Sequence, residues 1–344
     1  MAHPHPLLIE MVAGRGPDPT RPVEGSSVLV ASAVEHRVAG LLASAVLDGR
    51  VRLDDGERLR LIEFDMAARV RHRQLREALA IVARRGAAIS VEFATFKGVS
   101  AAERWYERPG ERSMSDLDLL VAPGDRARVD AIAHALAPST ALDPRDLEGV
   151  RTGRLPGLNL VLEVDPAEAA SAGQRVAVDL HFDLLKYGIP DRQGDEIWAR
   201  TRTWQVAEGV AVRVLDPEVA IVQLLVHANR DRLRDLHDYA DFARLLAREH
   251  IDWDFVHEFV AREGIDVPVY CSLDAITAGL GLPSIPHPPV EGWRPALWRR
   301  LWPEQERLAA GDPTRGERRR RRFLAVMVRG RAMEGVTAWI RGTS

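Results

Sequence analysis

The chain has 344 residues and 46% of them are hydrophobic, so it can bury a substantial core in one large domain or two ordinary ones. Its formal net charge of −3 gives no reason to expect nucleic acid or an acidic membrane as a partner. Cys271 is the single cysteine, which excludes a disulfide framework and a cysteine-rich zinc site and favours a cytoplasmic protein. No apolar run reaches the ~18 residues of a membrane span, so we expect no membrane insertion.

The first part of the chain is expected to be an arm followed by helices. Residues 1–24 are rich in proline and glycine, which favours a flexible arm. The apolar spacing of Val28–Leu47 and of Asp54–Arg85 is that of amphipathic helices. We therefore predict an N-terminal helical segment over residues 25–86.

The pattern changes over residues 87–215, where we predict a sheet domain. Short β-branched or alternating runs indicate strands, and two helical stretches lie between them. The predicted strands are 88–96, 116–121, 158–164 and 175–182, the last two joined as a hairpin, and the predicted helices are 101–106 and 125–137. A strand–helix–strand unit followed by further strands predicts an α+β (mixed α/β) domain.

Helical patterns return after Pro217. Residues 218–246 fit one long helix or two, and three further helices are expected at 254–263, 267–278 and 293–308. A proline-rich break near residue 283 divides this part into a helical domain at 216–282 and a Pro/Arg-rich helical region at 283–344.

The strongest local feature is Ser115-Asp116-Leu117-Asp118, which begins an alternating strand. Alternate residues of a strand share a face, so the carboxylates of Asp116 and Asp118 point the same way while the leucines point into the core. Two adjacent carboxylates beside a buried strand repel each other and lose hydration, so they favour a bound cation. Oxygen ligands at this spacing suit Mg²⁺.

A second alternating run contains Asp179 and His181, which share one face of their predicted strand. A third carboxylate would complete a two-metal site and could take the proton of an attacking hydroxyl. Asp179 is our preferred candidate, and Glu163 and Asp165 on the preceding strand are its competitors.

A candidate phosphate site precedes the aspartates. Lys97, Gly98 and Ser100 lie where a strand gives way to a helix, so glycine permits close approach and the lysine adds a positive charge. Arg112 either contacts phosphate or pairs with its neighbour Glu111. Ser115, directly before the aspartates, is included in the same predicted nucleotide site.

A polar face is expected on the helix after Pro217. Five polar residues follow one another at spacings of three or four residues and would therefore share one helix face: His227, Arg230, Arg234, His237 and Asp241. This face could hold a base or the acceptor of a transfer reaction. A solvated stripe of intrahelical ion pairs explains it equally well.

These motifs make the sequence resemble a known family. Phe96-Lys97-Gly98, Ser115–Val121, Val178–Phe182 and His227–Leu246 are similar to segments of the bacterial "uncharacterised nucleotidyltransferase" family, which belongs to the DNA-polymerase-beta-like superfamily. The resemblance covers about residues 28–250. It implies a polymerase-beta-like sheet domain with helical segments before and after it.

The resemblance also implies a reaction: transfer of a nucleoside monophosphate from an NTP to a hydroxyl or phosphate, with release of pyrophosphate. Asp116 and Asp118 would hold Mg²⁺, or Mn²⁺, and Asp179 would be the third ligand and base. ATP is the assumed NTP, and a small molecule or peptide, as in natural-product biosynthesis, is the assumed acceptor. Most superfamily members have Gly-Ser where this chain has Lys97-Gly98, which leaves the triphosphate contacts open.

Three other functions are compatible with parts of the sequence. Arg232 and His237 resemble the short motif of HEPN-like RNase toxins, although that reading leaves the aspartates unexplained. A catalytically inactive nucleotide-binding module would lack at least one carboxylate, and all three candidates are present. A nucleic-acid reader would rest on the basic run Arg315–Arg322, where a solvated helix face is the simpler interpretation.

Overall fold

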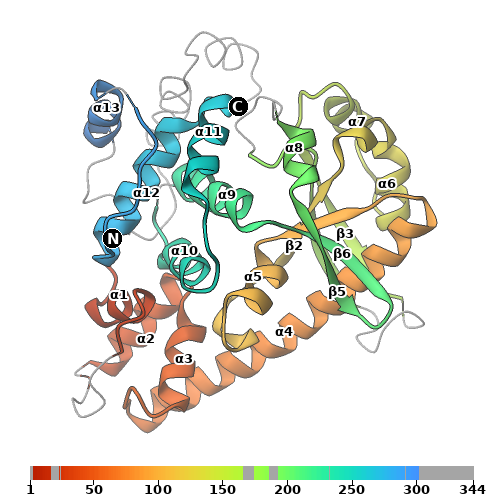
Figure 1. The fold of residues 1–344 in the computed structure, drawn as a ribbon. Helices are drawn as coiled ribbons and strands as arrows, with labels where there is room; N and C mark the ends of the chain where they lie inside the picture. Colours follow the sequence, from red (N-terminus) through yellow and green to blue (C-terminus); the bar gives the residue numbers. More distant parts are fainter. Residues whose placement is uncertain are drawn as a thin grey trace.

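The computed structural model describes residues 3–16, 23, 25–165, 174–185, 193–231, 233–290 and 292–301. The predicted hairpin tip, Arg232 and the basic run Arg315–Arg322 lie outside these residues. No helix in the described part of the chain is both long and apolar enough to cross a membrane. Figure 1 shows a sheet at one side of the molecule and a group of helices at the other.

Six strands form one mixed sheet in the order β3-β4-β2-β1-β6-β5. Their bounds are β1 Phe93–Phe96, β2 Asp116–Val121, β3 Gly157–Glu163, β4 Arg175–His181, β5 Thr201–Ala207 and β6 Val210–Leu215. The pairs β2–β4 and β1–β6 are parallel, and the others are antiparallel. The predicted α+β class is therefore confirmed. The hairpin of β5 and β6 was not predicted, because its strand β5 is at the sheet edge and carries mostly polar residues.

The helices lie before, between and after the strands. They are α1 Pro6–Val12, α2 Ser26–Glu35, α3 Ala39–Leu47, α4 Asp55–Ala88, α5 Gly98–Arg104, α6 Val129–Leu136, α7 Pro144–Arg151, α8 Gly194–Ala199, α9 Pro217–Arg230, α10 Leu236–Arg248, α11 Trp253–Glu263, α12 Asp266–Leu280 and α13 Trp293–Leu301, with 3-10 turns at Pro109–Glu111 and Pro123–Arg128. The stretch at 218–246 is thus two helices. Helix α4 is about 50 Å long at 1.5 Å per residue and runs from α3 to the sheet (Figure 1).

Two predictions for the N-terminal part are wrong. Within the predicted arm, α1 begins at Pro6, a favoured first residue, and the ring of His5 caps it. Its residues Leu8 and Val12 are buried in the core shared with the C-terminal helices. The single helix expected over 28–47 is interrupted, because the backbone turns at Arg37, where φ is +60°.

The core divides according to the two faces of the sheet. Leu117 and Leu119 of β2 pack on α4 and α6 in one cluster, whereas Leu120 belongs to a second cluster with the C-terminal helices. The alternation of β2 therefore directs Asp116 and Asp118 to the face that looks toward those helices. The predicted domain boundaries stay predictions.

A buried ion pair joins the loop before β2 to helix α10. The guanidinium of Arg112 donates to Asp241 from Nε at 2.9 Å and from Nη2 at 2.7 Å, and the hydroxyl of Tyr106 donates at 2.7 Å. Burial raises the pKa of Asp241, but Arg112 and His237 lower it by more, to about 2. The carboxylate is therefore charged and fully paired.

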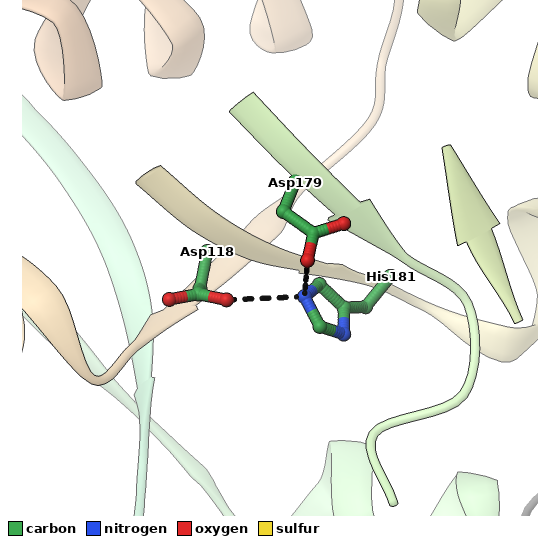
Figure 2. Close-up of side chains that lie close together, drawn as sticks. All are labelled: Asp118, Asp179 and His181. Atoms are coloured by element: carbon green, nitrogen blue, oxygen red, sulfur yellow. Dashed lines mark hydrogen bonds and ion pairs between the residues drawn. The ribbon is translucent and has the colours of Figure 1, made fainter. Parts of the chain in front are cut away.

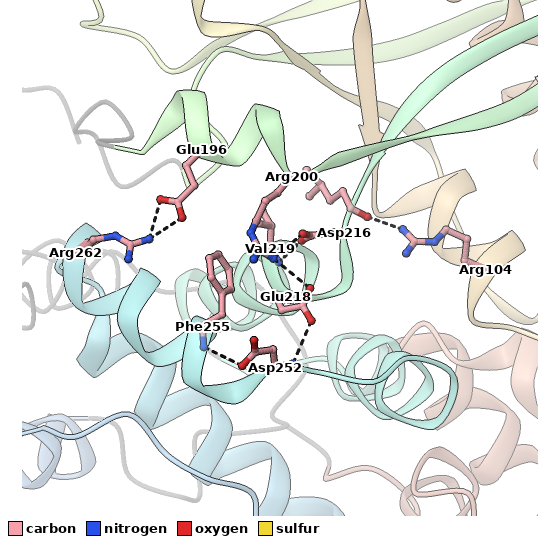
Figure 3. A network of polar contacts seen from close by, with 10 residues as sticks. Arg104, Glu196, Arg200, Asp216, Glu218, Val219, Asp252, Phe255 and Arg262 are labelled. Carbon is pink, nitrogen blue, oxygen red and sulfur yellow. Dashed lines mark hydrogen bonds and ion pairs between the residues drawn. The ribbon is translucent and has the colours of Figure 1, made fainter.

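A second polar network connects β6 and α8 to helices α9 and α11 (Figure 3). Asp216 caps α9 by accepting from the Val219 amide at 3.0 Å and also accepts from Arg200 at 2.9 Å. The Arg200 guanidinium lies 3.4 Å from the centroid of the Phe255 ring. Because these contacts join four elements, they fix how the helices sit against the end of the sheet.

We predict that Arg112→Met lowers the free energy of unfolding by about 3–5 kcal/mol, because it leaves Asp241 charged and buried without its cation. Urea unfolding at pH 7 measures the change. The matched control is Arg151→Met, which breaks only surface ion pairs with Asp130 and Glu148 and should cost little or nothing. A loss for Arg112→Met no larger than that of the control would contradict this assignment.

Candidate functional site

The parallel pairing of β2 with β4 brings two aspartates together. Asp118 is directly opposite Asp179 in the register, as Leu117 is opposite Val178. Both aspartates project from the same face of the sheet, and His181, two residues further along β4, projects with them (Figure 2). Residues more than 60 positions apart in the sequence therefore form one cluster.

His181 lies between the two carboxylates. Its Nε2 is 3.2 Å from Oδ1 of Asp118 and 3.1 Å from Oδ2 of Asp179. The imidazole is buried, and Phe96 packs edge-on against it with a centroid distance of 4.8 Å. Because Nδ1 is buried with no hydrogen-bond partner, the tautomer that fits is the one with its proton on Nε2, shared by the carboxylates.

This donor set fits a divalent cation. One ligand atom from each of Asp118, Asp179 and His181 lies within 4.8 Å of the others. Carboxylate oxygens suit Mg²⁺ and Mn²⁺, and His181 would add a nitrogen ligand, as Mn²⁺ and later transition metals accept, only in the tautomer whose Nε2 carries no proton. Asp116 is on the same face but is not a member of this closest group.

The two aspartates of β2 have pKa values shifted in opposite directions. Burial and the nearby charge of Asp118 raise the pKa of Asp116, against a hydrogen bond from Ser115 at 3.3 Å. Burial also raises the pKa of Asp118, but Lys97 and the His181 hydrogen bond lower it by more, so its net shift is downward. Of these two carboxylates, Asp118 is therefore the one that stays charged more readily.

Lys97 forms the junction between β1 and α5 in a strained conformation, with φ 54° and ψ −141°. Such a backbone costs a non-glycine residue about 1–3 kcal/mol and persists only where its surroundings impose it. Gly98 follows with φ +25°. The hydroxyl of Ser100 is buried and donates to the Lys97 carbonyl at 3.2 Å, so it braces this turn.

The other predicted nucleotide residues occupy different surroundings. Ser115 is exposed, and its hydroxyl donates to Asp116 at 3.3 Å. Arg112 is engaged by Asp241, so the expected alternative of a pair with Glu111 is wrong. Glu111 instead accepts from the Ser44 hydroxyl at 2.7 Å.

The competitors for the third carboxylate lie elsewhere. Asn159 is the β3 residue opposite Asp179, and Glu163 is four residues further, on the order of 13 Å along the strand. Glu163 accepts from the Ser139 hydroxyl at 2.8 Å at that end. Asp165 follows Glu163, so neither residue is near the cluster.

The polar face expected on one helix is wrong, because its residues are divided between α9, α10 and the segment that joins them, where they form a corner. His227 Nδ1 is 2.9 Å from Arg230, Asp241 holds Arg112, and Arg234 is buried. Burial, and after it the charge of Lys97, lowers the pKa of His227 well below its usual value, so this corner lies within electrostatic reach of Lys97. A role in acceptor binding stays a prediction.

Sequence reasoning missed Asp238 in this corner. It is buried on α10, one turn before Asp241, and has no ion pair with any described residue. Burial raises its pKa to about 8, with repulsion from Asp231 and Asp235 adding to the shift. The only signal in the sequence was a carboxylate three residues before Asp241, which is common on helix surfaces.

A model described as "Uncharacterised nucleotidyltransferase" matches residues 24–280. The chain belongs to this family. The resemblance inferred from the motifs is thereby confirmed, and every predicted site residue lies within the matched range of this nucleotidyltransferase family member.

Two further comparisons concern individual proteins. The crystal structure of an antigenic nucleotidyltransferase-like protein from Paracoccidioides brasiliensis is similar to 60% of this chain and 92% of its own chain, with 14% sequence identity and a TM-score of 0.37. No curated protein matches this chain.

We predict that Asp238→Asn stabilises the protein at pH 8 and that the gain shrinks toward pH 5. The unfolded carboxyl has a pKa of about 3.9, whereas the folded one has a pKa of about 8. Folding therefore takes up a proton between these values, and wild-type stability falls as pH rises through this interval. Melting temperatures of both proteins at pH 5, 6.5 and 8 test this. A difference in melting temperature between the two proteins that is the same at all three pH values would contradict the raised pKa of Asp238.

Proposed function

We propose that this nucleotidyltransferase family member transfers a nucleoside monophosphate from an NTP to a hydroxyl or phosphate group and releases pyrophosphate. The observation that carries the proposal is the register of β2 and β4, which sets Asp118 beside Asp179 with Asp116 on the same face. Three carboxylates and one lysine at one sheet face suit a reaction in which a cation and positive side chains offset phosphate charge.

Each residue then has a chemical role. Asp118 and Asp179 would hold Mg²⁺ or Mn²⁺, with Asp116 as a further ligand, and such a cation offsets negative charge on the transferred phosphate. His181 orients both carboxylates through its shared N–H. Asp179, the more exposed of the pair, would accept the proton of the attacking hydroxyl.

Lys97 and Ser115 complete the proposed NTP site. The charge of Lys97 lowers the pKa of Asp118, so it acts on the cluster, and Ser115 is exposed directly before β2. ATP is the proposed donor, and the proposed acceptor is a small molecule or peptide that enters beside the α9–α10 corner. The proposed location is the cytoplasm.

The alternative of a HEPN-like RNase is weakened by His237. Its imidazole is buried 3.8 Å from Asp241, and burial lowers its pKa to about 3. A histidine in this state is a poor acid or base at neutral pH. The nucleic-acid reading rests on residues outside the described range.

We predict that one or more of the four NTPs binds with Mg²⁺ or Mn²⁺, by isothermal titration, and that Asp118→Asn or Asp179→Asn weakens this binding more than ~100-fold. Loss of an outer partner of a metal site already costs 10–100-fold, and these residues would contact the metal itself. Pyrophosphate release, measured in parallel, should fall with binding.

Glu163→Gln is the matched control, because it changes a carboxylate of the same sheet at a distance from the cluster. It should bind the same NTP with unchanged affinity. Absence of metal-dependent binding of every NTP to the wild type would overturn the transferase proposal.

A further inference from the structure

We propose that Lys97 is a nucleophile that carries the nucleoside monophosphate covalently between the NTP and the acceptor. This inference rests on the proposed function and deepens it. It replaces direct transfer by two successive transfers through one side chain.

The first support is the position of Lys97 in the chain. Strand β1 ends at Phe96 and helix α5 begins at Gly98, so Lys97 alone makes the strand-to-helix turn. Its φ of 54° is one of four positive values among the described non-glycine residues. A sharp, strained turn between a strand and a helix is a recurrent way to present a nucleophilic side chain above the edge of a sheet.

The second support is the surroundings of the amine. Lys97 is half-buried, and in the part of the chain that the structure describes no carboxylate oxygen lies within ion-pair distance of its Nζ. The Nζ lies over the Phe96 ring, 5.7 Å from its centroid. A lysine that serves only as a charge gains most from a close counter-ion, whereas a nucleophilic lysine must be able to exist as the neutral amine.

Electrostatics point in the same direction. Burial lowers the pKa of Lys97, Asp118 partly opposes this, and the positive charge of Arg230 lowers the pKa again. The balance is downward although the negative charges of Asp118, Asp231 and Asp238 raise the pKa. A cation bound between Asp118 and Asp179 would add positive charge near the amine and favour its neutral form further.

The side chain of Phe96 lies beside both the Lys97 amine and the candidate metal centre. Phe96 contacts Lys97 Nζ on its ring and His181 at a centroid distance of 4.8 Å. In the register of β1 with β2, Phe96 is also opposite Asp118. The amine is therefore within electrostatic reach of the carboxylates that would hold the cation, and the cation would position the phosphates of an NTP.

The two steps balance. The neutral Nζ of Lys97 attacks the α-phosphorus, an N–P bond forms, the P–O bond to the β-phosphate breaks, and its electron pair leaves with pyrophosphate. The nitrogen loses one proton to solvent. The acceptor oxygen then attacks phosphorus and gives up its proton, the N–P bond breaks, and its electron pair returns to Nζ, which takes up a proton.

The chain allows an unusually clean test, because Lys97 and Lys186 are its only lysines. The full-length protein is incubated with Mn²⁺ or Mg²⁺ and each NTP in turn, without any acceptor. We expect an intact-mass increase of one nucleoside monophosphate, an adduct that is labile in acid and stable in alkali as a phosphoramidate is, and peptide mapping of the adduct to residue 97. Isotope exchange between pyrophosphate and the NTP should also occur without acceptor.

Two variants distinguish a role of Lys97 as a nucleophile from a role of its positive charge alone. Lys97→Arg keeps a positive charge but cannot become a neutral amine at working pH, so it should lose the adduct and the exchange while it still binds the NTP. Lys186→Arg, the matched control, should form the adduct as the wild type does.

The outcomes separate this inference from the proposed function. Metal-dependent NTP binding with neither adduct nor exchange in the wild type would overturn the nucleophile and leave direct transfer. An adduct on another residue, or one that persists in Lys97→Arg, would overturn it as well. No NTP binding at all would overturn the proposed function and this inference with it.

Discussion

The parallel pairing of β2 with β4 is the constraint on which the candidate site depends. It places Asp118 opposite Asp179, and the two-residue period of the strands then brings Asp116 and His181 to the same face. A shift of one residue in this register would turn one strand's acidic side chains into the leucine-rich core. The buried Leu117 and Leu180 hold the register and thereby hold the site.

The C-terminal helices pack on the side of the sheet that carries the acidic cluster. The side chains of Asp118 and Asp179 are only 12% and 27% exposed, so the carboxylates are partly removed from water and their electrostatic interactions become strong. The Arg112–Asp241 pair fixes α10 against the loop that leads into β2, and Asp216 starts α9 where β6 ends. Through these contacts, residues of the α9–α10 corner come within electrostatic reach of Lys97.

Much of this architecture could be predicted because it follows from local patterns. The alternation of Asp116–Val121 appears in the sequence as it does in the structure. The apolar spacing along α4 does so only in the second half of the helix, where Leu75, Leu79 and Val82 are buried, whereas Leu59, Met66 and Val70 in the first half are exposed. The pairing of β2 with β4 could not be derived in this way, because register depends on contacts between distant residues. For the same reason, the sequence did not reveal that Arg112 pairs with Asp241.

Other features depended on weak signals. Helix α1 has only seven residues, so its propensity is marginal and packing decides its existence. The break between α2 and α3 requires a positive φ at Arg37, and the sequence gives no signal for it because this residue is not glycine. Asp238 resembles any surface carboxylate until the fold buries it. In each case tertiary contacts, which a single sequence does not display, override or replace the local preference.

The central claim is that a divalent cation binds between Asp118 and Asp179 beside an NTP. The most direct measurement is anomalous X-ray scattering from crystals of the full chain grown with Mn²⁺ and a non-hydrolysable NTP analogue. The account predicts an anomalous peak coordinated by oxygens of both carboxylates, with the triphosphate next to it. Mn²⁺ bound elsewhere, with no anomalous peak beside the carboxylates of Asp118 and Asp179, would contradict it.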